Sequence, residues 1–331
     1  MAMQVDANVV TELTWDYVTR HPALVKLYEK GKASQWNAST DVDWSPEVEF
    51  GSPLDMQFGQ DFIEQFMPDS PIARFGEEGR TRMAWEFQSW MVSQFMHGEQ
   101  GALVATARLV ETAPEIDSKF YAANQVADEA RHVEAYARYL NDKLQHQYPI
   151  SAPLQSLLED IMSEKRWDIT YLGMQIMVEG LALAAFGLGN FMFQDPIIKQ
   201  ITDLVMRDEA RHVAFGLLSL QGLYPQMTSA ELREREEFVM QASQLMHDRF
   251  LLEQVWERVG VDVEEGKTYA HSNPLMMVFR QMLFSKIVPN LRKLGLLTDP
   301  VRQQFERLDI IHFEAQPDSA TEFDPALTAT A

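Results

Sequence analysis

The pentapeptide Asp-Glu-Ala-Arg-His occurs at residues 128 to 132 and again at residues 208 to 212, an offset of 80 residues. Each copy places a glutamate three residues before a histidine, which gives the pairs Glu129 with His132 and Glu209 with His212. Three residues are just under one helical turn, so the two side chains of each pair share one face of a helix. No other histidine in the chain has a glutamate at this spacing.

A further glutamate lies thirty residues before each of these glutamates: Glu99 in MHGEQGALVATARL and Glu179 in QIMVEGLALAAFGL. The residues around both are strongly apolar, which predicts that both carboxylates are buried. A buried carboxylate is costly unless a cation compensates its charge.

The midpoint of each thirty-residue interval carries signals for a turn between two helices. One midpoint falls at Pro114, and the other falls just before Asp195 and Pro196, where Asp suits the N-cap and Pro suits the first helical position. In an antiparallel hairpin, residues equally far from the turn lie at the same height. Each single glutamate therefore lies level with a Glu-x-x-His pair, roughly 18 to 21 Å from the turn.

Helical periodicity, sparse Gly and Pro and the near absence of alternating β-branched residues predict an all-α chain. We place a single helical domain at residues 1–313, with its metal-binding core at about 76–222, and a flexible tail at 314–331. The polar loop 33–46 is expected only to anchor an N-terminal arm through Trp36 and Trp44. The predicted helices are 6–31, 54–66, 76–111, 114–145, 152–165, 167–193, 196–222, 229–258, 273–295 and 299–313.

The composition excludes several classes of function. A net charge of −21, from 28 Lys plus Arg and 49 Asp plus Glu, argues against nucleic acid or an anionic membrane as a partner. The absence of cysteine excludes disulfides, thiolate zinc sites and iron–sulfur clusters. With no signal peptide or membrane span evident, we expect a cytoplasmic protein.

Two single glutamates and two Glu-x-x-His pairs on four helices form a ligand set for two metal ions, because two divalent ions balance four carboxylates. Carboxylates with one imidazole per metal suit iron or manganese. We predict two iron ions, with manganese or a mixed Mn/Fe pair left open. The duplicated neighbours are expected to orient the ligands, since aspartate can accept a ring N–H from histidine: Asp128, Arg131, Asp208 and Arg211.

The segments GEQGALVATARL and DEARHVEAYARYL resemble the ferritin-like di-iron carboxylate superfamily, and are similar to hydroxylase subunits of bacterial multicomponent monooxygenases. VEGLALAAF through ITDLVMRDEARH also resembles the ribonucleotide reductase small subunit. The resemblance covers about residues 95–216. It implies a ferritin-like four-helix bundle with additional N- and C-terminal helices.

The resemblance also implies a role for each ligand. One iron would take Glu99, Glu129 and His132, and the other would take Glu179, Glu209 and His212, with Glu129 and Glu209 bridging. The implied activity is that of a monooxygenase-type oxidoreductase, which uses dioxygen to oxidise or hydroxylate a substrate. Electrons would come from a separate reductase, and assembly as a homodimer is left open.

We expect a small, mostly apolar organic substrate in a pocket beside the metals, lined by Phe95, Ala102, Leu103, Ala182, Leu183 and Phe186. Tyr136 lies four residues after His132, on the same helical face, and is either redox-active or a support for the ligands. Two other functions are left open. One is a radical-generating subunit like that of ribonucleotide reductase, and the other is a ferroxidase or iron-handling protein.

Overall fold

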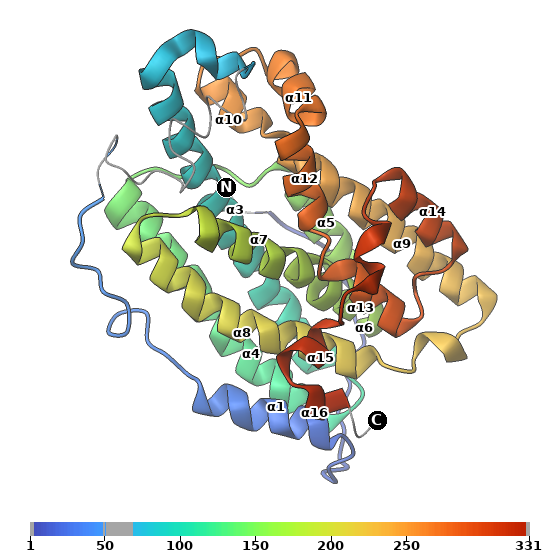
Figure 1. The fold of residues 1–331 in the computed structure, drawn as a ribbon. Coiled ribbons are helices and arrows are strands. Elements are labelled where there is room, and N and C mark those ends of the chain that lie inside the picture. Colours follow the sequence, from blue (N-terminus) through green and yellow to red (C-terminus); the bar gives the residue numbers. More distant parts are fainter. Residues whose placement is uncertain (1–2, 49, 51–68, 329–331) are drawn as a thin grey trace.

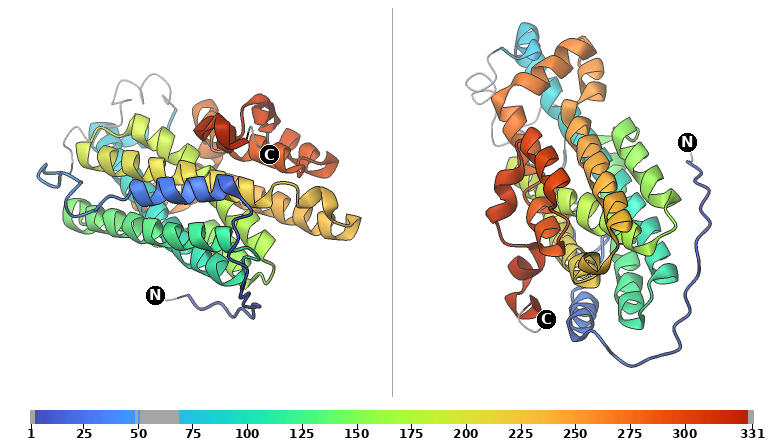
Figure 2. Two further views of the ribbon diagram at one scale, coloured as in Figure 1. Left: turned by 90° about the horizontal axis from the view of Figure 1, so that it is seen from below. Right: turned by 90° about the vertical axis from the view of Figure 1, so that its right-hand side faces the viewer.

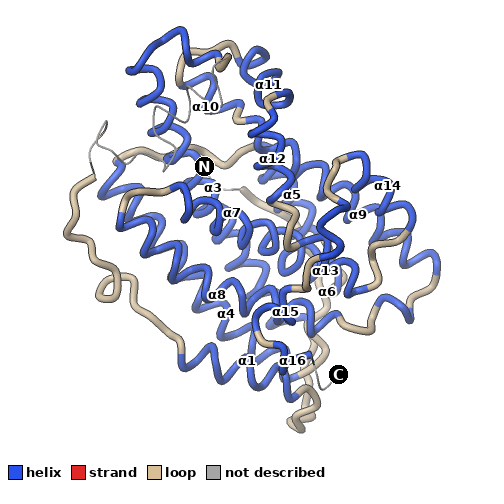
Figure 3. The backbone as a smooth tube through the Cα atoms, viewed as in Figure 1, coloured by secondary structure: helices blue, strands red, loops and turns tan. Residues whose placement is uncertain are grey.

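The structure, a computed structural model, describes residues 3–48, 50 and 69–328. Over these residues the chain forms helices joined by loops, and none of them is in a strand (Figures 1 and 3). The all-α fold predicted from the sequence is confirmed, whereas the helix predicted at 54–66 lies outside the described residues. In chain order the elements are α1 (Pro22–Ala33), η1 (Pro71–Phe75), α3 (Gly76–Thr112), α4 (Ile116–Arg138), η2 (Tyr139–Leu144), α5 (Ala152–Ser163), α6 (Trp167–Tyr171), η3 (Leu172–Val178), α7 (Glu179–Met192), α8 (Pro196–Leu220), η4 (Tyr224–Gln226), α9 (Ser229–Asp248), η5 (Arg249–Leu251), α10 (Glu253–Arg258), α11 (Val263–Ser272), α12 (Pro274–Met282), α13 (Ile287–Leu294), α14 (Asp299–Arg307), η6 (Ile311–Ala315), α15 (Ser319–Phe323) and α16 (Pro325–Thr328).

Four long helices form the ferritin-like bundle: α3, α4, α8 and the helix that runs from α6 through η3 into α7 (Figure 1). Both predicted turns are confirmed. The first helical hairpin turns between Thr112 and Ile116. The second turns before Pro196, where the Asp195 carboxylate accepts a hydrogen bond from the Ile197 N–H at 2.8 Å.

The helix Trp167–Met192 is long and apolar enough to span a membrane on composition alone, with a mean hydropathy of 1.5. Within the protein, 78% of its most apolar window is buried, so packing in the bundle accounts for its apolar character. Its middle, η3, is a π-helical segment that ends directly before Glu179. Such segments insert a residue into a helix and change the direction of the side chains around it.

The N-terminal helix is shorter than predicted, because residues 6–21 are extended rather than helical (Figure 2). Backbone N–H groups in this segment bond to the first hairpin turn instead of to their own helix. Those of Arg20 and His21 donate to one oxygen of Asp117 at 2.8 and 2.9 Å. The helix α1 begins at Pro22 and packs across α4 and α8.

Two predicted helices of the C-terminal half are broken, and α11 was not predicted. The predicted helix 229–258 is interrupted after α9 by η5, and Leu252, whose φ of 62° is left-handed, separates η5 from α10. The predicted helix 273–295 breaks between Met282 and Ile287. A continuous helix would place Pro289, which lacks an N–H, in its interior.

The segment expected to be a flexible tail contains α15 and α16. Helix α15 packs against α8, and its Ser319 and Ala320 are buried. The Ser319 N–H donates to the Asn290 side chain at 2.8 Å, and Lys26 and Lys30 of α1 pair with Asp324. This segment therefore belongs to the folded domain as far as residue 328.

Candidate metal centre

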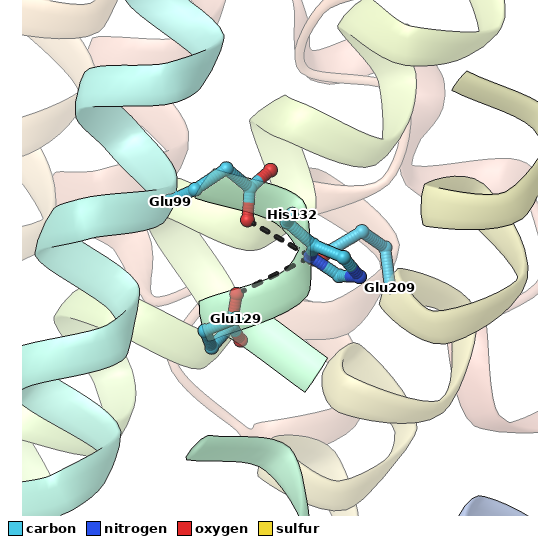
Figure 4. A group of neighbouring side chains, drawn as sticks. All are labelled: Glu99, Glu129, His132 and Glu209. Atoms are coloured by element: carbon cyan, nitrogen blue, oxygen red, sulfur yellow. Dashed lines mark hydrogen bonds and ion pairs between the residues drawn. The ribbon is translucent and has the colours of Figure 1, made fainter. Parts of the chain in front are cut away.

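All six predicted ligand side chains are buried and converge at the centre of the bundle. Figure 4 shows four of them pointing toward one another: Glu99 from α3, Glu129 and His132 from α4, and Glu209 from α8. Ligand atoms of these four lie within 4.8 Å of one another, as do those of a second group of Glu129, Glu179 and His212. The two groups share Glu129, so the geometry suits two adjacent metal ions.

Each histidine ring has one nitrogen, Nδ1, that faces the carboxylate ligands, and a second, Nε2, that faces away from them. His132 Nδ1 lies 3.1 Å from Glu99, 3.2 Å from Glu209 and 3.5 Å from Glu129. His212 Nδ1 lies 3.1 Å from Glu129 and 3.3 Å from Glu209. Glu129 and Glu209 each lie close to both histidines, a position from which a carboxylate could be shared by two ions.

Each outer ring nitrogen meets an aspartate of the other pentapeptide copy. His132 Nε2 lies 3.1 Å from Asp208, and His212 Nε2 lies 3.2 Å from Asp128. Neutral histidine has one N–H, so a proton held on Nε2 by aspartate leaves Nδ1 free to bind a cation. Arg131 donates to both aspartates, and Arg211 donates to Asp208.

These contacts set the charge of the aspartates. Burial opposes ionisation of Asp208, but its hydrogen bond with His132 and the charges of His132 and Arg211 hold its pKa below the ordinary value. The same balance, led by His212 and Arg131, lowers the pKa of Asp128. Both aspartates are therefore ionised acceptors for the histidines.

Two residues that the sequence analysis gave no chemical role complete this outer layer. Trp36 Nε1 donates to Asp208 at 2.8 Å, and the indole is stacked on His132 with ring centroids 6.2 Å apart. Gln35 donates to Asp128 at 2.8 Å. No helical spacing connects this loop with α4 or α8, so the sequence carried no signal for these contacts.

Two glutamines, also missed, donate to one ligand. The side-chain amides of Gln125 and Gln175 lie 2.8 and 2.9 Å from the same oxygen of Glu179. Gln125 also donates to Glu129 at 2.8 Å. Each glutamine precedes a ligand glutamate by four residues, a helical spacing that could have revealed them.

Without bound cations, protons balance part of the negative charge of the ligand cluster. Burial raises the pKa of Glu99 and Glu179 well above 4.5, and the charge of Glu209 adds to both shifts. Burial opposes protonation of His132 and His212, but the surrounding carboxylates raise both pKa values well above 6.5. Four atoms of the cluster have no partner in hydrogen-bond geometry, although several lie at ion-pair distance from one another: Glu129 Oε2, Glu179 Oε2, Glu209 Oε1 and His212 Nδ1. Buried ligand atoms without partners fit a pair of divalent ions.

A cavity that is partly open to solvent adjoins this centre, and the space between its lining atoms, including the part open to solvent, is about 440 Å³. Glu99, Glu179 and Glu209 form one part of its wall. Four of the predicted pocket residues line the rest: Phe95, Ala102, Ala182 and Phe186. Chemistry at the metals would therefore occur beside an apolar space.

Leu103 and Leu183, also predicted to line the pocket, lie outside the cavity wall and are half-buried. Each follows a ligand glutamate by four residues, which places it about 40° to one side of that glutamate around the helix. The cavity lies on the opposite side, where Ala102 and Ala182 follow the glutamates by three residues. Of the residues predicted to line the pocket, those on one side of each helix border the cavity and those on the other side do not.

Tyr136 is fully buried between two cavity-lining rings, with centroid distances of 5.9 Å to Phe95 and 6.1 Å to Phe186. Burial, with the charge of Glu99, raises its pKa well above 10. Its hydroxyl lies near that of Thr202 but has no partner with ordinary hydrogen-bond geometry. Tyr136 is thus a neutral phenol beside the Glu99 side of the centre.

The fold and this ligand set define an all-α, ferritin-like bundle with a centre able to hold two metal ions. No protein-family model matches the chain, and no curated protein matches it.

Among solved structures, the chain is similar to R2-like ligand-binding oxidases. One is a V72I mutant with an anaerobically reconstituted Mn/Fe cofactor, at 19% identity and a TM-score of 0.45, covering 86% of this chain and 93% of that one. Another carries an aerobically reconstituted metal cofactor after photoconversion, at 17% identity and a TM-score of 0.45, covering 90% and 94%.

Proposed function

We propose that this chain is a dimetal oxidoreductase that activates dioxygen and oxidises or hydroxylates a small, mostly apolar substrate. The main observation in support is that one cavity is bordered both by three of the four ligand carboxylates and by four of the predicted apolar residues. A buried storage site would not need such a cavity. A bound pair of reduced metal ions would supply the electrons that dioxygen accepts.

Different residues of the chain have different roles in this proposal. The six ligand side chains would hold the ions, and Asp128 and Asp208 keep the outer ring protons of the histidines in place. Phe95 and Phe186 exclude water from the substrate side. Two iron ions are the favoured pair, and a mixed Mn/Fe pair has support from the cofactors named for the similar oxidases. A separate reductase would return electrons after each turnover.

A second candidate function is the generation of a tyrosyl radical for a larger partner protein. It is favoured by Tyr136, which is buried beside Glu99 and whose hydroxyl lies near Thr202 without ordinary hydrogen-bond geometry.

Loading with Fe(II) without oxygen, followed by a pulse of dioxygen, tests these functions. An oxygenase binds two irons per chain, and its consumption of dioxygen becomes sustained only when an electron donor and a substrate are both present. A stable tyrosyl radical signal that is lost in Tyr136→Phe would favour the second candidate. Growth of ferric mineral beyond two irons per chain would favour iron storage and contradict the proposal.

A further inference from the structure

A row of four aromatic rings leads from the metal centre toward the surface, through α4, α8 and α6. The rings of Tyr121 and Phe215 have centroids 4.3 Å apart, and Phe215 lies 5.3 Å from Tyr171. Tyr171 in turn lies 5.7 Å from Trp167, the first residue of α6. The first three side chains are fully buried, whereas Trp167 is only partly buried. In this aromatic row each ring contacts the next until solvent is reached.

The inner end of the aromatic row lies beside the ligands of one ion. Tyr121 precedes Gln125 by about one turn of α4, and Gln125 donates to both Glu129 and Glu179. Burial raises the pKa of Tyr121 well above its ordinary value, and the charges of His212 and Glu179 also act on its hydroxyl. Tyr121 is therefore a neutral phenol close to the ion that His212 and Glu179 would hold.

Packing alone does not explain why two members of the row are tyrosines. The hydroxyls of Tyr121 and Tyr171 are fully buried, and neither has a partner in ordinary hydrogen-bond geometry among the described residues. The nearest hydroxyls to that of Tyr171 belong to Ser118 and Ser219. Phenylalanine would fill the same space without burying an unpaired polar group. A phenol differs from phenylalanine in being much easier to oxidise, because it can release its hydroxyl proton together with an electron.

The aromatic row has no counterpart around the other copy of the repeat. Eighty residues away, the equivalent positions contain neither tyrosine nor tryptophan: Phe87, Met91, Ala135 and Ile201. The ligands are thus repeated while the row is present once. A role on one side of the centre explains this asymmetry better than the repeat does.

We propose that the aromatic row is an electron-transfer route through which Trp167 is oxidised when dioxygen reacts at the centre and no substrate fills the cavity. The inference goes beyond the proposed function but rests on it, because dioxygen bound at the centre is the oxidant. Without such a route, the oxidising equivalent would remain among the metal ligands. The route moves it to a residue that a reductant in solution can reach.

The net step moves one electron from the Trp167 indole to the dioxygen at the centre, and the indole N–H proton passes to solvent. Tyr121 and Tyr171 each lose one electron and the hydroxyl proton, and each regains both when the next residue of the row reduces it. The proton of Tyr121 moves toward the carboxylates beside it, and that of Tyr171 moves toward the serine hydroxyls near it. Phe215 is not oxidised, but its ring provides the contact across which the electron passes between the two tyrosines.

Loading with Fe(II) without oxygen, followed by dioxygen with no substrate and no electron donor, tests the proposal. Catalase is added to remove free hydrogen peroxide. EPR of frozen samples detects aromatic radicals, and ring-deuterated tyrosine distinguishes tyrosyl from tryptophanyl signals. Peptide mass spectrometry measures the oxidised fraction of each tryptophan. Wild-type protein is expected to form a transient aromatic radical and to oxidise Trp167 in preference to Trp15, although Trp15 is much more exposed.

Tyr171→Phe keeps the ring but removes the oxidisable hydroxyl. It should reduce the oxidised fraction of Trp167 to that of metal-free protein while the bound iron stays at two per chain. Tyr224→Phe is the matched control, because Tyr224 is also a buried tyrosine whose hydroxyl lacks a partner in hydrogen-bond geometry, and it lies outside the row. This control should oxidise Trp167 as fully as wild type. Each substitution removes an unpaired buried hydroxyl, so neither thermal midpoint should fall.

Three outcomes would overturn the proposal. In the first, Tyr171→Phe oxidises Trp167 as fully as wild type does. In the second, wild-type protein binds and oxidises two irons without oxidising Trp167, or oxidises Trp36, which is stacked on His132, in its place. In the third, Trp15 is oxidised as strongly as Trp167, which would indicate a freely diffusing oxidant. Failure of wild-type protein to hold two irons would instead refute the proposed function.

Discussion

The bundle has two halves, one made by α3 and α4 and the other by η3, α7 and α8. Equivalent ligands lie 80 residues apart in the two halves, but the residues around them differ. Four residues before the single glutamate stands Phe95 in the first half and Gln175 in the second. Phe95 lines the cavity, whereas Gln175 donates to Glu179. The first half thus presents an apolar wall where the second presents an amide.

A second difference follows from the first. Four residues after the histidine stands Tyr136 in the first half and Gly216 in the second. A Cβ at Gly216 would lie 2.3 Å from the Gln175 Cβ, so the glycine makes room for the glutamine. The candidate metal ligands are duplicated while their environments are not. Four sets of substitutions test this difference between the halves.

Removing a carboxylate shared by the halves should have the largest effect. Glu129 lies 3.5 Å from His132 Nδ1 and 3.1 Å from His212 Nδ1, so Glu129→Ala is expected to weaken both metal sites by more than about 100-fold. Metal content after dialysis measures this. Glu134→Ala, at an exposed glutamate of the same helix, is the matched control and should hold two ions. Retention of two ions by Glu129→Ala would show that the carboxylate does not bridge.

The crossed histidine–aspartate contacts allow the halves to be weakened separately. Asp208→Asn should weaken the ion bound through His132 by roughly 10- to 100-fold, because it removes the charged acceptor of that ring's proton. Asp128→Asn should do the same to the ion bound through His212. Stepwise competition with a chelator resolves the two affinities. If both variants weakened the same ion, the crossed arrangement would be contradicted.

The glycine of the second half can be tested through stability. Gly216→Ala should lower the free energy of unfolding by about 1 to 3 kcal/mol, because the backbone-proximal Gln175 Cβ cannot move aside easily. Gly187→Ala on α7 is the control, since the nearest atom to its new Cβ is Met206 Cε at 3.7 Å. Alanine favours a helix over glycine by up to about 1 kcal/mol, so the control should be neutral or stabilising. Denaturant unfolding of the metal-free protein compares the two. Equal stability of both variants would contradict the packing argument.

The parts of the site that the sequence predicted depend on local, periodic rules. The ligands follow from helical spacing, and the second turn follows from the capping chemistry of Asp195 and Pro196. Both are properties of a few neighbouring residues. The structure retains them because contacts with distant segments agree with these local preferences.

What the sequence did not predict depends on contacts between distant segments. Trp36 reaches Asp208 only because α1 packs across the bundle, and the predicted helix 229–258 is interrupted at the left-handed Leu252. The N-terminal extension follows from an acceptor, Asp117, about a hundred positions away. Such contacts leave no periodic signal in one sequence.

The smallest expected effect concerns the amide that distinguishes the second half. Gln175→Met keeps the length of the side chain but removes the donor to Glu179, which retains the hydrogen bond from Gln125. One hydrogen bond to a buried group is worth about 0.5 to 1.5 kcal/mol, so the ion bound by Glu179 should weaken about 2- to 10-fold. Stepwise competition with a chelator should show no change at the ion bound by Glu99.

Phe95→Met on α3 is the matched control at the equivalent position of the first half, and it should leave both affinities unchanged because Phe95 donates no hydrogen bond.

The metal affinities in this experiment also depend on pH. Glu99, Glu179, His132 and His212 all have raised pKa values in the fold, so their stabilisation of the metal-free protein is lost as pH rises through those values, and bound metal must displace their protons. Affinity should therefore rise with pH in wild-type protein and in Gln175→Met alike. If the two ions weakened equally in Gln175→Met, the difference between the halves would lie in the cavity alone, and the amide would have no part in it.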